Sequence, residues 1–377
     1  MKDAKELLKN LIALPSINPM GRADLPPKLT GESRVAAYVE DFIRKTGADL
    51  ITQDTGGGMK NVGGMICRGS KKTILLQAHM DTVGIGENLR LLMPEERDGK
   101  IYGRGACDDK GSLAAMLSAL QKAAQKPAGD YNIIVMAVTD EEYTWAGSRT
   151  LVENQPTKDA WLGIVGEPTG CRLVNGYKGV ARFALETTGV AAHSSQPERG
   201  SNAIYRMGRV LANLEEYSAE LTKICDGTLG CETLSVGTIS GGEAVNIVPE
   251  SCKIEIDRRL TRKTYPEEAR ESLQRHLQER GLDFTLSPLT DAQRAALIEE
   301  THPGVQLLTD SCRRAGISPK PITVAFGSDA YRMNNAGIPT LLLGPGSIDV
   351  AHTDAEHIPV SELEQAQNFY LSVMVTA

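Results

Sequence analysis

Histidine and carboxylate side chains follow the apolar segments of this chain at several points, and together they could bind divalent cations. His79 and Asp81 come directly after the apolar run 73–78. The same pattern returns after three later apolar runs and before an alanine-rich stretch, at Asp140, Glu141, Glu142, Glu167, His352, Glu356, Asp108 and Asp109. Two imidazoles and three carboxylates, one of them able to bridge, suit a pair of divalent ions. The mixed nitrogen and oxygen set favours zinc, with cobalt or manganese as alternatives.

Each of these residues also has a simpler explanation. A histidine after a strand is usually a hydrogen-bonded surface residue, and Asp108 with Asp109 could cap a helix. Glu141 and Glu142 could be an exposed charged pair. Taken together these explanations fail, because several like charges at one edge cost free energy unless a cation neutralises them. A dinucleotide site is not indicated, because "GRGACDDKG" lacks the G-x-G-x-x-G spacing.

An α/β domain is expected to position the candidate ligands. The segments "KTILLQAH", "YNIIVMAV" and "WLGIVGE" are nearly all apolar, as in parallel strands that helices cover on both faces. Ligands bind beyond the carboxyl ends of such strands. Residues 177–288 instead alternate apolar and polar side chains, which is typical of half-exposed strands. We therefore predict an α/β fold with a mostly parallel sheet (1–176 and 289–377), interrupted by an inserted α+β domain of βαββαβ order (177–288).

Composition excludes several classes of partner. The chain has 377 residues, enough for about two domains, and a net charge of −7, which argues against nucleic acid or an anionic membrane as the main partner. No apolar run approaches the ~18 residues of a membrane span, and the N-terminus does not resemble a signal peptide. Seven scattered cysteines without a C-x-x-C motif predict reduced thiols in a cytoplasmic protein.

Seven motifs follow one another along the chain: "AHMDTV", "YGRGACDDKG", "TDEE", "GEPT", "AAHSSQPERGSNAI", "NIVPE…DRR" and "GPGSIDVAHTDAE". In this order they resemble the di-zinc amidohydrolases, a family that includes acetylornithine deacetylase, succinyl-diaminopimelate desuccinylase, aminoacylase and carboxypeptidase G. The match extends from about residue 8 to 370. The resemblance implies two Zn²⁺ ions per subunit, with Co²⁺ or Mn²⁺ as alternatives. His79 and Glu167 would bind one ion, Glu142 and His352 the other, and Asp108 would bridge them.

The resemblance also implies roles for residues beside the metal ligands. Asp81 would hydrogen-bond the ring of His79, and Glu141 would act as general base toward a water that the two ions make acidic. The inserted domain would serve as a lid and form a homodimer. From it, His193 would reach the partner subunit's site and stabilise the oxyanion. Asn246 and Arg259 would hold a substrate carboxylate.

The motifs indicate the type of reaction, but they fit more than one class of substrate. "GPGSIDVAHTDAE", "YGRGA" and the short chain are closest to acetylornithine deacetylase-like members, which predicts hydrolysis of an N-acyl (acetyl-like) amino acid. Asp109 occupies a position where many deacetylases carry methionine, and Tyr143 and Trp145 replace a turn of small residues. These departures leave a dipeptidase or carboxypeptidase as the alternative. A non-catalytic metal-binding scaffold is a third possibility, but such a protein would have no use for an acid at Glu141.

Overall fold

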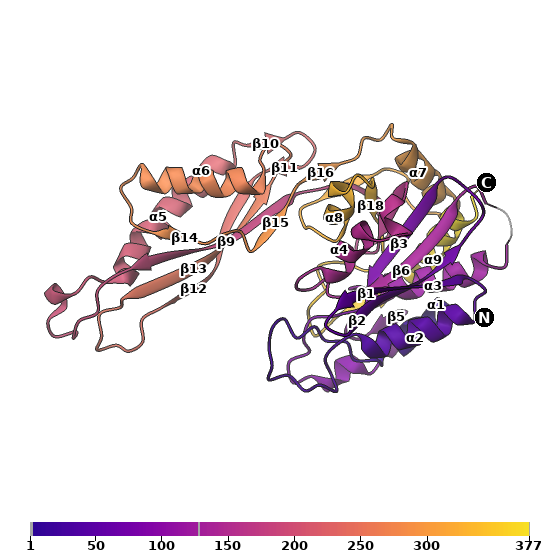
Figure 1. Cartoon of the computed structure of the whole chain (residues 1–377), viewed down its shortest axis with the longest axis horizontal. Helices are drawn as coiled ribbons and strands as arrows, with labels where there is room; N and C mark the ends of the chain where they lie inside the picture. Colours follow the sequence, from indigo (N-terminus) through magenta and orange to yellow (C-terminus); the bar gives the residue numbers. More distant parts are fainter. Residues whose placement is uncertain (1–2, 127–128, 377) are drawn as a thin grey trace. The chain divides into compact units, whose positions relative to one another are not determined.

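The computed structural model describes residues 3–126 and 129–376, and the chain divides into two compact units (Figure 1). The first unit comprises Met1–Asn175, Ile298–Ile322 and Ser328–Ala377, and the second comprises Gly176–Leu297 and Thr323–Gly327. The second unit thus extends beyond the predicted end at residue 288. The reason is that β15 (Asp291–Gln293) pairs with β9 (Gly179–Thr188) in the sheet of the second unit.

The α/β class is confirmed by the sheet of the first unit. Its four central strands run parallel in the order β6, β3, β7, β18. The two strands beyond β6 are antiparallel. These six of the sheet's nine strands are β1 (Asp49–Gly56), β2 (Met59–Ile66), β3 (Thr73–His79), β6 (Asn132–Val138), β7 (Leu162–Val165) and β18 (Thr340–Leu342).

Helices cover both faces of this sheet, which explains why its central strands are almost wholly apolar. Leu162 and Ile164 of β7 belong to the same buried cluster as side chains of α3 and α9. Gly163 between them lies against Met333 of α8 instead, and alternate residues of a strand point to opposite faces. The helices are α1 (Ala4–Ile12), α2 (Ser33–Arg44), α3 (Lys110–Ala123), α4 (Ala146–Glu153), α7 (Pro303–Ala315), α8 (Ala330–Asn335) and α9 (Val360–Met374).

The second unit is an antiparallel sheet with two helices. Its order along the chain is β9, α5, β12, β13, α6, β14, which is the predicted βαββαβ sequence apart from the short β10–β11 hairpin and β15. One sheet face is apolar, and Phe183, Leu185 and Ile254 pack there with Met207 and Leu273 of the helices. The elements are α5 (Ala203–Leu221), β12 (Thr233–Gly241), β13 (Ser251–Leu260), α6 (Pro266–Gln278) and β14 (Thr285–Leu286).

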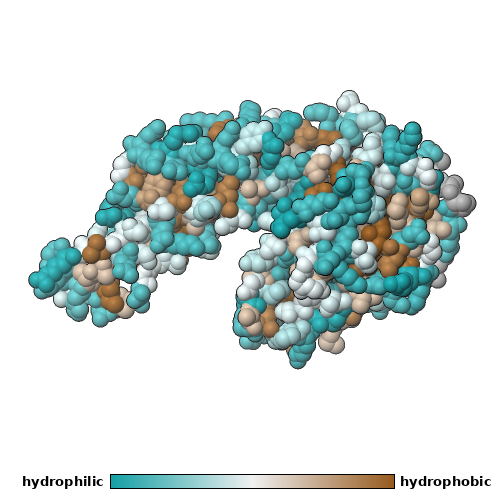
Figure 2. Space-filling view, viewed as in Figure 1, coloured by the Kyte–Doolittle hydropathy of each residue, from teal (hydrophilic) through white to brown (hydrophobic). Residues whose placement is uncertain are grey.

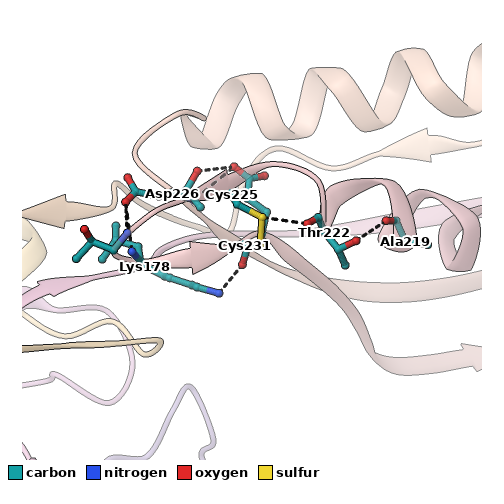
Figure 3. The surroundings of a disulfide bond; sticks show 10 residues. Lys178, Ala219, Thr222, Cys225, Asp226 and Cys231 are labelled. Carbon is teal, nitrogen blue, oxygen red and sulfur yellow. Dashed lines mark hydrogen bonds between the residues drawn. A yellow bond between two sulfur atoms is a disulfide. The ribbon is translucent and has the colours of Figure 1, made fainter.

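The prediction that all cysteines are reduced is wrong for one pair. Cys225 and Cys231 form a disulfide bond (Figure 3). They face each other because β10 (Cys225–Asp226) and β11 (Gly230–Cys231) pair antiparallel. The Asp226 carboxylate supports the turn by accepting the N–H groups of Thr228 and Leu229. The sequence signal was a five-residue spacer containing two glycines, which a search for C-x-x-C does not find.

The remaining elements are short. Within residues 3–126 and 129–376, no helix is both long and apolar enough to cross a membrane. The short elements are η1 (Leu89–Leu92), β4 (Glu95–Arg97), β5 (Lys100–Tyr102), η2 (Thr157–Asp159), β8 (Val174–Tyr177), η3 (Pro197–Arg199), β16 (Ala296–Leu297), β17 (Ile322–Val324) and β19 (His357–Pro359).

Candidate metal centre

Four of the five predicted metal ligands meet at the carboxyl ends of the parallel strands. His79, Asp108 and Glu142 each offer one ligand atom, and these atoms lie within 4.8 Å of one another. The Asp108 carboxylate lies between two imidazoles, with Oδ1 2.9 Å from His79 Nε2 and Oδ2 3.0 Å from His352 Nε2. His352 Nε2 is also 3.3 Å from Glu142 Oε1. A carboxylate that presents one oxygen to each of two ligand groups has the arrangement required of a bridging ligand.

Asp81 holds the first of these imidazoles in the orientation that a metal site requires. His79 Nδ1 lies 2.9 Å from the Asp81 carbonyl oxygen and 3.4 Å from its Oδ1. With its proton on Nδ1, the ring presents the free electron pair of Nε2 toward Asp108 and Glu142. The buried Asp81 carboxylate also accepts the backbone N–H groups of Glu141 and Glu142, at 3.1 and 3.0 Å. One aspartate therefore orders both the strand end that carries His79 and the loop that carries the acidic pair.

Asn18 extends this network, and no motif in the sequence pointed to it. Its side-chain amide is buried and donates to Asp81 Oδ2 and Asp140 Oδ1, both at 2.8 Å. Asp140 adopts a left-handed backbone conformation with φ of 60°. Such a conformation is costly for a residue other than glycine and persists where surrounding contacts impose it. The Asn18 hydrogen bond is one of these contacts.

The fifth predicted ligand, Glu167, and the predicted base, Glu141, are part of the same electrostatic cluster. Burial raises the pKa of Glu167 well above its ordinary value, and the charges of Glu141 and Asp108 add to this increase. Loss of hydration likewise raises the pKa of Glu141; the positive charge of His79 opposes the increase, whereas Asp329 and other acidic neighbours add to it. These shifts show that carboxylates crowd here in a poorly hydrated space. A divalent cation would relieve this cost.

The carboxylates in turn raise the pKa values of the two imidazoles. Hydrogen bonds to Asp108 and Glu142 raise the pKa of His352 to about 10. Burial alone would raise the pKa of Asp108, but hydrogen bonds from His352 and His79 hold it well below its ordinary value. Protons on the two rings thus balance the carboxylates in the protein alone. The donor set of imidazole nitrogens and carboxylate oxygens fits zinc, which would displace those protons.

Asp329 is a second residue that the sequence analysis missed. It is buried and accepts a hydrogen bond of 3.0 Å from the Gln77 side chain in β3. Burial raises its pKa to about 6, and its charge acts on Glu141. The one available signal was Gln77 itself, a polar residue inside an otherwise apolar strand, which required a buried partner.

The three predicted substrate-contacting residues lie in the second unit, at two different ends of its sheet. His193 forms an isolated bridge with Ile247, and the Ser194 N–H donates to the Asn246 carbonyl at 3.0 Å, so His193 and Asn246 lie side by side. Arg259 lies near the other end of β13, where its guanidinium donates to Asp257 at 2.7 and 3.1 Å. From Ser251 to Arg259, β13 spans roughly 25 Å at a rise of about 3.3 Å per residue, and Asn246 precedes its first residue. One copy of the unit does not bring that predicted pair together.

Comparison with known proteins relates this arrangement to a single family. The family model described as Peptidase family M20/M25/M40 matches residues 75–376. The chain is 34% identical over 287 residues to an acetylornithine deacetylase from Myxococcus xanthus, covering 72% of this chain and 71% of that protein. Its fold is similar to that of an M20 family metallo-carboxypeptidase from Sulfolobus solfataricus, with a TM-score of 0.81, 19% identity and coverage of 100% and 99%. It is also similar to a Bacillus subtilis protein described as a dinuclear metal binding peptidase, with a TM-score of 0.67, 15% identity and coverage of 99% and 96%.

Proposed function

This chain belongs to peptidase family M20/M25/M40 and is a metallohydrolase, and from that premise we propose that it is a zinc-dependent amidohydrolase that cleaves N-acyl amino acids. The observation that carries the proposal is the position of Asp108 between His79 and His352. In this proposal His79 and Glu167 hold one zinc ion, Glu142 and His352 hold the other, and Asp108 bridges them. The dinuclear site of the Bacillus subtilis relative supports a pair of ions.

Each residue of the site then has a chemical task. Two cations bound there would supply the positive charge that makes a shared water acidic near neutral pH. Glu141 accepts a proton from the attacking water and passes it to the leaving amine. Loss of hydration raises the pKa of Glu141 above that of an ordinary glutamate, which is the direction that strengthens a base. Asp81 keeps the proton of His79 on Nδ1, so that Nε2 stays available to the metal.

His193, Asn246 and Arg259 complete the site if two copies associate through the second unit. Because His193 and Asn246 lie at one end of the sheet and Arg259 at the other, we assign them to different active sites of a homodimer. Arg259 would hold the substrate carboxylate in its own subunit, while His193 would stabilise the oxyanion in the partner subunit. Asn246 would accompany His193, because the neighbouring Ser194 donates its N–H to the Asn246 carbonyl oxygen and His193 forms a bridge with Ile247.

The surface of the second unit supports such an association. β12 is the edge strand of its sheet, and among the described residues no strand pairs with its outer side. An exposed edge strand offers backbone groups to a second chain. Tyr205, Ile239 and Val245 are exposed apolar side chains on or near this edge. Figure 2 shows hydrophobic atoms on the surface of this unit where the β12–β13 loop lies in Figure 1.

A complementation experiment tests the dimer. Glu141→Gln and His193→Ala should each be inactive alone. Mixed dimers place the intact His193 of one subunit beside the intact Glu141 of the other, so mixing the unfolded variants and refolding them together should restore part of the activity. Mixtures as inactive as their components, in a sample that light scattering shows to be dimeric, would contradict the assignment of His193.

The substrate class rests on the relative named acetylornithine deacetylase and on the motifs that resemble that branch. We expect a panel of N-acetyl amino acids, assayed with zinc or cobalt, to be hydrolysed faster than dipeptides. A dipeptidase or carboxypeptidase is the second candidate, favoured by Asp109 and by the fold shared with a metallo-carboxypeptidase. Faster cleavage of dipeptides or C-terminally extended peptides would establish that alternative. If the protein binds stoichiometric zinc but hydrolyses neither class of substrate, a non-catalytic metal-binding scaffold would be the remaining interpretation.

A further inference from the structure

Arg104 is a buried arginine outside the ligand set whose side chain joins its own loop to two other loops of the first unit. It is 3% exposed. Its Nε and Nη2 donate to the Gly84 carbonyl oxygen at 3.2 and 3.1 Å. Its Nη1 donates to the Thr353 carbonyl oxygen at 3.3 Å and to the Glu356 carboxylate. All three nitrogens of the guanidinium are therefore occupied.

Glu356 continues these contacts to the bridging aspartate. It is 1% exposed, and one carboxylate oxygen pairs with Arg104. The other, Oε1, accepts the backbone N–H groups of Cys107 at 3.2 Å and Asp108 at 3.3 Å. The Gly103 N–H also donates to the Glu356 carbonyl oxygen at 3.2 Å. Glu356 thus bonds directly to the backbone at the start of the turn, at Gly103, and at Cys107 and Asp108 themselves.

The three loops joined in this way each carry a predicted ligand or its support. Gly84 follows His79 and Asp81 at the end of β3, Asp108 precedes α3, and Thr353 follows His352. Only His79 lies within a strand; Asp108 and His352 lie in loops, and His352 has a φ of 63°. Loops hold side chains less firmly than strands do. Two loop-borne ligands therefore need an external restraint if they are to keep metal-binding geometry.

We propose that Arg104 and Glu356 form a clamp that positions Asp108 and His352 relative to His79, and that metal affinity depends on this clamp. The inference rests on the proposed metal centre, but the clamp residues themselves are not ligands. A guanidinium suits the task because its planar fork bonds several acceptors in fixed directions at once. A lysine at the same place carries the same charge on a single nitrogen and cannot reach Gly84, Thr353 and Glu356 together.

The second unit contains a matched control. Arg258 is also buried (1% exposed) and pairs with the buried Glu232 at 2.7 Å. It donates in addition to Tyr217 and to the Ala269 carbonyl oxygen. Arg258→Lys therefore perturbs a buried, multiply bonded arginine–glutamate pair without touching the candidate metal centre.

The experiment measures zinc affinity of the purified metal-free protein by competition with a chromophoric chelator, and melting temperature with and without zinc. Arg104→Lys and Arg258→Lys should both lower the melting temperature of the metal-free protein. Only Arg104→Lys should also weaken zinc binding, by about ten- to hundredfold, as loss of residues that orient metal ligands typically does. The increase in melting temperature on adding zinc should shrink in Arg104→Lys alone.

Two results would overturn the clamp. Unchanged zinc affinity in Arg104→Lys would make it a purely structural residue, and equal losses in both variants would attribute the effect to general destabilisation. If Arg104→Lys does not fold, the same measurements are made on Glu356→Gln. This variant keeps an acceptor for the Asp108 N–H but loses the negative charge that pairs with Arg104. Wild-type protein that binds no zinc would instead refute the metal centre itself, and the clamp's proposed effect with it.

Discussion

Replacing Glu141 and Glu142 separately by glutamine should give opposite results for metal binding, although the two residues are neighbours. Glu142 Oε1 lies 3.3 Å from His352 Nε2 within the ligand cluster, so Glu142→Gln should lose one metal ion. Glu141 is anchored through its backbone N–H, which donates to Asp81, and Glu141→Gln keeps that bond. We therefore expect Glu141→Gln to retain two ions per subunit.

The expected loss of turnover in Glu141→Gln follows from its role as a proton acceptor. Positioned general bases contribute about 10²- to 10⁴-fold to rate, or roughly 3–5 kcal/mol of activation free energy. The metal-free protein should not lose stability. Loss of hydration and the charges of Asp329, Glu142 and Asp108 already raise the pKa of Glu141, so a neutral amide suits these surroundings at least as well as a carboxylate.

The assay combines steady-state turnover, elemental analysis of zinc and the free energy of unfolding, each on the wild type and both variants. Near-normal turnover in fully metallated Glu141→Gln would refute the assignment of the base. Loss of zinc from Glu141→Gln would show that Glu141 is itself a ligand. Full zinc retention in Glu142→Gln would remove Glu142 from the ligand set.

Three further predictions concern metal, pH and the disulfide. Removal of metal by a chelator should abolish hydrolysis, and added zinc or cobalt should restore it. Activity that persists in protein free of transition metals would refute the metal-dependent mechanism. Burial raises the pKa of Asp109 to about 8 and that of Asp329 to about 6. The unfolded chain therefore releases these protons at lower pH than the folded chain does. The free energy of unfolding of the metal-free protein should consequently fall from about pH 5 to 7. A melting temperature that rises over that range would contradict this prediction. Replacing Cys225 and Cys231 together by serine should lower the free energy of unfolding by about 2 kcal/mol, as expected for a short closed loop, with unchanged zinc content; an unaltered denaturant midpoint would contradict this.

The family and the α/β class were predictable from the chain alone, and both predictions are confirmed. Strands that are buried on both faces have to be apolar throughout, so β3 and β6 stand out in the sequence. The parallel strands place their carboxyl ends at one edge, which is why His79 and Glu142 could be expected to meet. The ligand and base roles themselves stay predictions until metal content and turnover are measured.

Other features could not be predicted because they depend on packing between distant segments. The end of the second unit was placed too early because β15 is only three residues long and joins its sheet through pairing with β9. The disulfide was missed because the cysteine count gave no pairing, whereas the β10–β11 register brings Cys225 opposite Cys231. The roles of Asn246 and Arg259 stay predictions; their separation follows from the length of β13, which motif order does not reveal.

The sequence by itself determined which residue types end each strand, because hydrophobic periodicity and strand-end position are local properties of the chain. Only the tertiary structure decided which buried polar side chains bond to one another. Asp329 bonds to Gln77, and Arg104 pairs with Glu356, in each case across 252 residues. Such contacts form when distant segments pack together and exclude the water that would otherwise hydrogen-bond the polar side chains. No local sequence pattern therefore predicts them.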